Sequence, residues 1–256
     1  MDWRNVAEDI SDWIGEYAKK NGVGTLVVGV SGGVDSAVTS TLSAMTGIAT
    51  IVLNMPIHQD RMQNELSERH IGWLKTKWAN VSEEKIDLTS TYDEFCSKMG
   101  DDLSELSLAN SRARLRMTVL YAIAGSNNGI VVGTGNKVED FGIGFFTKYG
   151  DGGVDISPIA DLYKSDVFAI GKELGVIEEI LDAAPTDGLW DDGRTDEEQI
   201  GASYEELEWA MRELENPSGS EMTEREREVM SLYAALNEAN SHKMAPIPVF
   251  KLDSAD

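Results

Sequence analysis

Residues 25–36, TLVVGVSGGVDS, decide the fold of this chain. An apolar, β-branched run stops at Gly32 and Gly33 and continues into a segment, 37–45, that favours helix. This order predicts a strand, a tight turn and a helix N-terminus, where free backbone N–H groups and the helix dipole form an anion site. Glycine lets the backbone approach phosphate oxygens closely, and the hydroxyls of Ser31 and Ser36 add two donors.

The charge of this loop indicates a metal ion beside the phosphates. The loop lacks the lysine of the Walker pattern GxxxxGK[ST], and its charged residue is Asp35, which would repel a bare polyphosphate. A divalent cation between carboxylate and phosphate removes that repulsion, and Mg²⁺ prefers these oxygen ligands. We therefore interpret residues 29–36 as a cradle for Mg-pyrophosphate; the alternative is an ordinary glycine-rich strand–helix turn.

Predicted strands and helices alternate along the chain, which indicates an α/β fold with a doubly wound parallel sheet flanked by helices. The expected strands are 25–30, 48–54, 85–88 and 130–132, and the expected helices are 2–20, 35–45, 62–79, 90–99 and 103–125. Ligands of such sheets bind beyond the carboxyl ends of the strands, where Gly133-Thr134-Gly135-Asn136 is also expected. We expect a single domain, 1–256, with a core over about 20–185 and a helical C-terminal part over about 196–256.

Composition narrows the classes of function. The 256 residues include 22 Lys plus Arg and 45 Asp plus Glu, a net charge of −23, which disfavours nucleic-acid binding. The single cysteine, Cys96, excludes an intramolecular disulfide framework and a multi-cysteine metal site, and we expect it to pack as a small apolar residue on a helix. The acidic, amphipathic N-terminus is unlike a signal peptide, and no run is long enough to span a membrane. These features predict a cytoplasmic protein without a membrane partner.

A second cluster of polar residues follows the fourth expected strand. Residues 133–140, GTGNKVED, and 145–155, FFTKYGDGGVD, place carboxylates and a lysine in glycine-rich loops at the expected ligand edge. Glu139 is a candidate for a second Mg²⁺ ligand, and Lys148 for pairing with an anionic second substrate. The alternative for Lys148 and Asp155 is a plain surface or turn position.

Taken together, these motifs resemble ammonia-dependent NAD synthetases. SGGVDS at 31–36 alone marks the wider N-type group of pyrophosphate-releasing ATP-binding enzymes, whereas FTKYGDGG at 146–153 is much narrower. With PTDGLW at 185–190, the resemblance runs from about residue 4 to Ser241-His242-Lys243. It implies an adenine nucleotide alpha hydrolase-like fold and a homodimeric ligase. The implied reaction amidates deamido-NAD to NAD with free ammonia through an acyl-adenylate, while ATP is cleaved to AMP and pyrophosphate.

The resemblance also implies roles for individual residues. Its ATP-binding positions are Gly29, Val30, Ser31, Gly32, Gly33, Val34, Asp35, Ser36, Thr134, Lys164 and Thr186. Its deamido-NAD positions are Arg114, Lys148, Asp155, His242 and Lys243, and its Mg²⁺ ligands are Asp35 and Glu139. The segment EDFGIG at 139–144 is one residue longer than the pattern ELLVG of relatives, so Glu139 and Asp140 both remain open as the metal ligand. We take Asp35, Glu139 and Asp151 as the catalytic set, with Asp151 orienting ammonium or accepting its proton.

Other interpretations stay open at this point. A different adenylating enzyme of the same loop group, a non-catalytic ATP sensor and a scaffold protein share the first motif. His58 and His70 lack metal-ligand spacing, and we expect them to be structural or exposed. Arg112, Arg114 and Arg116 cannot all face one ligand, because alternate positions on a helix point about 200° apart. We expect the polar segment 187–198 to form a lid over ATP.

Overall fold

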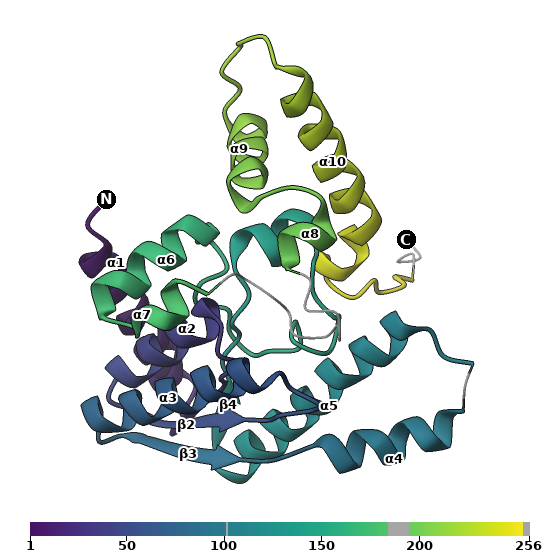
Figure 1. The fold of residues 1–256 in the computed structure, drawn as a ribbon. Coiled ribbons are helices and arrows are strands. Elements are labelled where there is room, and N and C mark those ends of the chain that lie inside the picture. Colours follow the sequence, from purple (N-terminus) through teal and green to yellow (C-terminus); the bar gives the residue numbers. More distant parts are fainter. Residues whose placement is uncertain (101, 184–194, 253–256) are drawn as a thin grey trace.

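The computed structural model describes residues 1–100, 102–183 and 195–252 and has a four-stranded parallel sheet at its centre (Figure 1). The strands are β1 (Thr25–Gly29), β2 (Ala49–Asn54), β3 (Val81–Lys85) and β4 (Gly129–Val131). Their order in the sheet is β3-β2-β1-β4. The chain therefore moves outward from β1 to β3 and then returns to the other side of β1. The carboxyl ends of β1 and β4 form the switch point at which ligands bind in such sheets.

Helices cover both faces of this sheet, which confirms the predicted α/β fold. Leu26 and Val28 of β1 point into one core with helices α1, α2 and α6, whereas Val27 points to the opposite core against α5. This alternation follows from the two-residue repeat of a strand buried on both faces. The helices are α1 (Trp3–Lys20), α2 (Val34–Met45), α3 (Arg61–Lys77), α4 (Thr89–Met99), α5 (Glu105–Ser126), α6 (Lys164–Leu174), α7 (Glu178–Leu181), α8 (Asp196–Ile200), α9 (Tyr204–Glu215) and α10 (Glu224–Met244), with a π-helix, η1, at Lys137–Ile143.

The helices α9 and α10 form a hairpin that projects from the sheet layers (Figure 1). It has its own apolar cluster, in which Leu207 and Val229 pack against Val138 and Ile143 of η1. The hairpin therefore reaches the sheet region through η1. Because this apolar cluster is separate from those of the sheet, we propose that the chain divides into a nucleotide-binding core and a helical C-terminal part. None of the described helices is both long enough and apolar enough to cross a membrane.

The third strand was predicted four residues too late along the chain. The strand is Val81–Lys85, not Lys85–Leu88, and only Val81 in it is buried. β3 is an edge strand, so its polar side chains face solvent and carry no apolar alternation. The apolar residues that suggested a strand, Ile86 and Leu88, follow it and donate backbone hydrogen bonds to Asn54 and Pro56.

His70 is structural, as predicted, and it lies in the core between α2 and α3. Its side chain is 0% exposed, its Nε2 lies 3.1 Å from the Ser40 hydroxyl, and its ring stacks on Trp73. Burial lowers the pKa of His70 to about 4, because the charged ring would lose its hydration. Cys96 of α4 is half-buried in an apolar cluster, also as predicted.

We expect His70 to make the protein less stable as the pH falls from about 6.5 to about 4. The ring is protonated near pH 6.5 in the unfolded chain but only near pH 4 in the folded chain. The contribution of the neutral ring to stability is therefore fully present above pH 6.5 and decreases below it. At about pH 4 the free energy of unfolding is lower by about 3 kcal/mol for this reason. Urea unfolding of the wild type and His70→Gln between about pH 7.5 and 4 measures it. If the difference in the free energy of unfolding between the wild type and His70→Gln did not change with pH, the expectation would be wrong.

Candidate active site

A cavity of about 1040 Å³ opens at the carboxyl ends of the strands. Its walls come from the loop after β1, residues 53–64 after β2, one face of α5, and residues 131–135 and 144–154. Such a volume is at the upper end for ligand pockets and is large enough for a nucleotide. Both glycine-rich segments that the sequence placed at the ligand edge line it.

The loop after β1 has the geometry of an anion site. Gly33 caps α2 without a side-chain hydrogen bond, so the first backbone N–H groups of α2 point to the cavity end of the helix. The Ser36 hydroxyl accepts from the backbone N–H of Ser31, and the Ser31 hydroxyl accepts from that of Gly33. These internal bonds hold the loop in shape, and the first backbone N–H groups of α2 remain available to a phosphate.

Position 32 requires glycine for two reasons, its backbone conformation and the lack of space for a side chain. Its φ is +96°, and a Cβ there would lie 2.5 Å from the Gln63 carbonyl oxygen. We expect Gly32→Ala to destabilise the protein by about 2 kcal/mol or more and to weaken ATP binding, because the loop must move. Gly47→Ala is the matched control, since Gly47 has a φ of +73° but open space around it. Thermal unfolding and ATP titration of both variants test this; equal losses of stability would show that the contact with Gln63 is unimportant.

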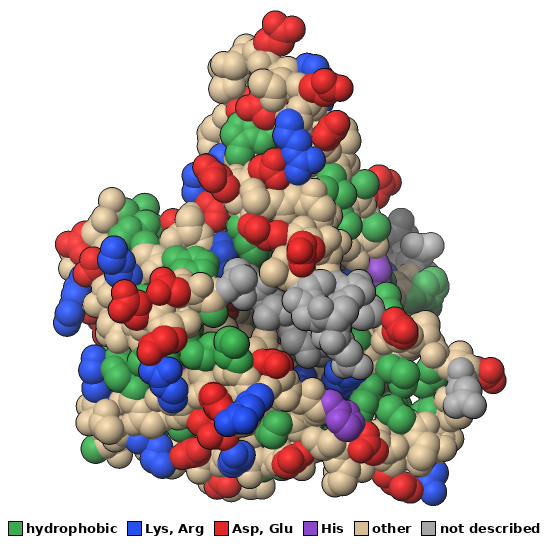
Figure 2. All heavy atoms as spheres, in the orientation of Figure 1, with side chains coloured by type: hydrophobic (Ala, Val, Ile, Leu, Met, Phe, Trp, Pro, Cys, Tyr) green, Lys and Arg blue, Asp and Glu red, His purple; other side chains and the backbone are tan. Residues whose placement is uncertain are grey.

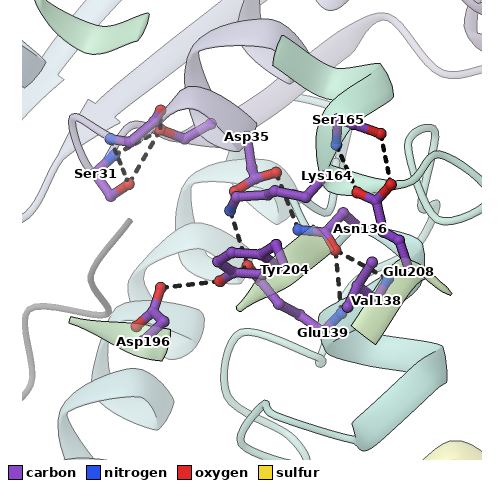
Figure 3. Close-up of polar contacts among 12 residues, drawn as sticks. Ser31, Asp35, Asn136, Val138, Glu139, Lys164, Ser165, Asp196, Tyr204 and Glu208 are labelled. Atoms are coloured by element: carbon purple, nitrogen blue, oxygen red, sulfur yellow. Dashed lines mark hydrogen bonds and ion pairs between the residues drawn. The ribbon is translucent and has the colours of Figure 1, made fainter. Parts of the chain in front are cut away.

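Three charged side chains meet in front of this loop (Figure 3). The Lys164 ammonium donates to Asp35 at 2.6 Å and to Glu139 at 2.8 Å, and Lys164 is only 3% exposed. Burial alone would lower the pKa of Lys164, but the two carboxylates raise it above its usual range. Burial raises the pKa of Asp35, whereas the ammonium outweighs burial at Glu139 and lowers its pKa. The arrangement is a buried cation between two partly buried carboxylates.

Asn136 and Tyr204 hold this cluster, and sequence analysis did not identify either role. The Asn136 amide donates to Asp35 at 3.1 Å, while its oxygen caps η1 by accepting from the backbone of Val138 and Glu139. The Tyr204 hydroxyl donates to Glu139 at 2.5 Å and also contacts Asp196 (Figure 3). The residue that caps η1 therefore fixes the Asp35 carboxylate, and one residue of α9 fixes that of Glu139.

Glu208 supports the lysine from the other side. Its carboxylate accepts from both the backbone N–H and the hydroxyl of Ser165, at 2.8 and 2.6 Å, and from Arg212. Ser165 follows Lys164 at the start of α6, so Glu208 caps the helix that carries the lysine. Tyr204 and Glu208 are four residues apart on one face of α9.

The π-helix η1 separates the two neighbouring acidic residues. Glu139 bonds to Lys164, whereas the Asp140 carboxylate packs against Gly135, where any side chain would overlap it. A π-turn accommodates an additional residue in a helix. Burial, together with the Asp151 carboxylate, raises the pKa of Asp140 well above its usual value. Glu139, and not Asp140, therefore faces the Lys164 ammonium.

The donor set fits Mg²⁺ bound together with phosphate. Asp35 and Glu139 already share one cationic group, and carboxylate oxygens are preferred Mg²⁺ ligands. Within residues 1–100, 102–183 and 195–252, no group of three or more His, Cys, Asp or Glu side chains is arranged to hold a metal. Asp35 and Glu139 would therefore be the protein ligands of Mg²⁺, and oxygens of phosphate and water would complete its coordination.

Asp151 and Thr134 line the same cavity. The Asp151 carboxylate accepts from the backbone N–H of Thr147 at 3.0 Å, and enclosure by the cavity walls raises its pKa. Thr186 and most of the segment 187–198 lie outside the described residues.

The predicted deamido-NAD residues separate into two groups. Lys243 lines the cavity and donates to the carbonyls of Gly144 and Phe146. The others lie beside α5, outside the cavity lining: Arg114 donates to the Lys148 carbonyl, and the Lys148 ammonium donates to the His242 carbonyl at 2.6 Å. Further along α5, the Tyr121 hydroxyl donates to Asp155. These four predicted residues, Arg114, Lys148, Asp155 and His242, are named the α5 surface cluster.

Comparison with known proteins decides the family. The profile of the family described as NAD synthase matches residues 6–246. The chain belongs to the NAD synthase family. An NH3-dependent NAD(+) synthetase of Alkaliphilus metalliredigens is 36% identical over 249 residues, which cover 94% of this chain and 96% of the relative. NH3-dependent NAD(+) synthetase activity, a ligase reaction of NAD biosynthesis that uses ATP, follows by homology.

Solved structures of NAD synthase relatives have the same fold. An NH3-dependent NAD synthetase of Campylobacter jejuni, in complex with the nitrate ion, has a TM-score of 0.81 and 26% identity; the match covers 98% of this chain and 100% of that one. An NMN synthetase of Francisella tularensis has a TM-score of 0.86 and 31% identity, with coverage of 98% and 100%. Family membership sets aside the sensor, the scaffold and the other adenylating enzymes considered from the sequence.

Proposed function

We propose that this protein converts deamido-NAD to NAD through an acyl-adenylate formed in the cavity beside Asp35, Lys164 and Glu139. The observation that carries the proposal is the position of this cluster at the open N-terminus of α2, where the loop donors reach a phosphate. Magnesium bound by Asp35 and Glu139 would neutralise charge on the leaving pyrophosphate.

The residues of the loop and α6 serve the first step. A carboxylate is a poor electrophile, so its oxygen first attacks the α-phosphorus of ATP, and the bond from that phosphorus to the bridging oxygen breaks to release pyrophosphate. The backbone N–H groups at the open start of α2, from Val34 to Ser36, hold the pyrophosphate, while the Ser31 and Ser36 hydroxyls keep the loop in shape. Lys164, which its carboxylate partners keep protonated, supplies positive charge beside it.

Asp151 serves the second step. Ammonia attacks the acyl carbon, the bond to the adenylate oxygen breaks, and AMP leaves. The nitrogen loses a proton, and we assign the Asp151 carboxylate as its acceptor, because its raised pKa makes it a better base than an ordinary aspartate. The cavity walls limit the access of water, which would hydrolyse the adenylate.

A mononucleotide is the second candidate substrate. A relative that matches this chain over nearly its full length is an NMN synthetase, and we infer nicotinic acid mononucleotide as the corresponding candidate for this chain. The α5 surface cluster favours the dinucleotide here, since it offers Arg114 and Lys148 outside the cavity to the second nucleotide half.

We propose that two copies of the chain form a homodimer through the outer face of α5. Tyr121 and Tyr149 expose apolar surface there, next to the α5 surface cluster and outside the cavity lining. On the face shown in Figure 2, acidic side chains are instead spread over the α9–α10 hairpin and interleaved with Lys and Arg, as expected for a solvated surface. Light scattering of the wild type and Tyr121→Asp tests the dimer; an unchanged mass of the variant would contradict this interface.

The function is tested by incubating the protein with ATP, MgCl₂ and ammonium and either deamido-NAD or nicotinic acid mononucleotide. We expect NAD, AMP and pyrophosphate in equal amounts from deamido-NAD, and a slower reaction of the mononucleotide. A faster reaction of the mononucleotide would replace the proposed substrate. Glutamine in place of ammonium should give no product, because free ammonia is the proposed nitrogen source.

A further inference from the structure

The cavity is acidic, although both of its proposed substrates are anions. Its described lining has six carboxylate side chains and three cationic ones. The carboxylates are Asp35, Asp60, Glu139, Asp140, Asp151 and Asp196, and the cations are Arg116, Lys164 and Lys243. Lys164 is already neutralised by two carboxylates. Besides Lys164, which the proposed function places beside the pyrophosphate, the described lining offers substrate the cations Arg116 and Lys243, and of these two only Lys243 was predicted from the sequence.

Arg116 makes no ion pair with any described residue. Its Nε donates to the Met55 carbonyl at 2.9 Å, and one Nη donates to the Gln59 side-chain oxygen at 3.0 Å. A guanidinium has five N–H donors, so three have no partner in the described part of the chain. Burial, and next the neighbouring Arg112 cation, lower the pKa of Arg116 to about 10, and the Asp151 carboxylate offsets this only in part. The unused donors include a planar pair suited to a carboxylate or phosphate.

The position of Arg116 on α5 places it between the two halves of the site. One turn before it, Ala113 packs on the Asp151 loop, where a Cβ at Gly150 would lie 2.9 Å from the Ala113 Cβ. One turn after it, Leu120 contacts Gly29 at the end of β1. All three α5 residues line the cavity, whereas Arg112 and Arg114 do not, as the helical spacing predicted. Arg116 thus lies between the phosphate loop and the proposed ammonia site.

We propose that Arg116 binds an oxyanion of the reacting groups, either the nicotinate carboxylate or the α-phosphate of ATP, at the place where the two meet. This assignment rests on the proposed function, because that function brings both oxyanions to the junction. Arg116 would hold one oxyanion with the donors left free by Met55 and Gln59 and would screen it from the surrounding carboxylates. Its bonds to the loop after β2 keep the guanidinium oriented before substrate binds.

Calorimetric titration of Arg116→Gln with three ligands tests the assignment: deamido-NAD, NAD, and α,β-methylene ATP with MgCl₂. NAD has a carboxamide where deamido-NAD has the carboxylate. A loss of about tenfold or more for deamido-NAD with NAD unchanged supports the carboxylate as partner. The same loss confined to the ATP analogue supports the α-phosphate. Unchanged affinities for all three ligands, or equal losses for all three, overturn the assignment.

Three further variants separate binding from structure. Gln59→Leu removes one of the two loop contacts of Arg116 without removing the charge, and we expect it to lower the affected affinity less than Arg116→Gln does; losses equal to those of Arg116→Gln would show that Arg116 only anchors the loop. Arg112→Gln, one turn away and outside the cavity lining, should leave binding unchanged. If Arg116→Gln does not fold, Arg116→Lys keeps the charge but lacks the paired donors and should show the same selective loss, reduced in size. Wild-type protein that makes no NAD would refute the function, whereas active wild type with unaffected Arg116 variants would refute only this assignment.

Discussion

Replacing Asp35 with asparagine is expected to lower the rate of ATP-dependent pyrophosphate release by about 10³-fold. The amide keeps the shape of the side chain and an oxygen for the Asn136 donor, but it removes one of the two charges that would hold Mg²⁺. The fold should persist, because burial already disfavours the ionised form of Asp35. A coupled pyrophosphate assay and thermal unfolding of the same sample measure both effects.

Two other aspartates serve as controls for Asp35. Asp161, whose side chain is 98% exposed, pairs with Lys137 on the surface, and Asp161→Asn should retain full activity. Asp151→Asn should release pyrophosphate normally in a single turnover and slow only the formation of the amide. Normal pyrophosphate release from Asp35→Asn would remove its proposed role, and equal slowing of both steps by Asp151→Asn would remove the division of labour between the two residues.

The parts of the site that could be predicted are those fixed by short stretches of sequence. The stretch 25–36 combines a buried strand, a glycine turn and a helix start within twelve residues, so its anion-binding geometry follows from local rules. The same holds for Gly133 and Thr134 after β4, because the switch point of a parallel sheet is set by the order of its strands. For His70, the missing metal-ligand spacing predicted a structural or an exposed position, and the side chain is buried.

The supporting residues could not be predicted, because they come from distant parts of the chain. Tyr204 and Glu208 reach Glu139 and Ser165 across 65 and 43 residues, and nothing in the sequence of α9 indicates that contact. A capping residue such as Glu208 usually lies next to the helix it caps, whereas this one belongs to another helix. The placement of Asp140 depends on a π-helix, which has no sequence signal of its own.

Removing the charge of Lys164 is expected to have the largest combined effect on stability and activity. Lys164→Met would leave Asp35 and Glu139 buried beside each other without their cation, at a cost of about 3–5 kcal/mol in the free energy of unfolding. Adenylate formation should fall with it, since the ammonium is proposed to balance phosphate charge. Urea unfolding and the pyrophosphate assay measure the two effects.

A second substitution distinguishes charge from packing as the cause of this loss. Methionine keeps most of the volume of the lysine side chain, so adding Asp35→Asn to Lys164→Met should recover stability by removing one of the two facing carboxylates. Millimolar MgCl₂ should also raise the melting temperature of Lys164→Met more than that of the wild type, because the vacated position between two carboxylates then suits a cation. If neither the second substitution nor magnesium restores stability, Lys164 acts through its packing, and the charge balance argued for this site is wrong.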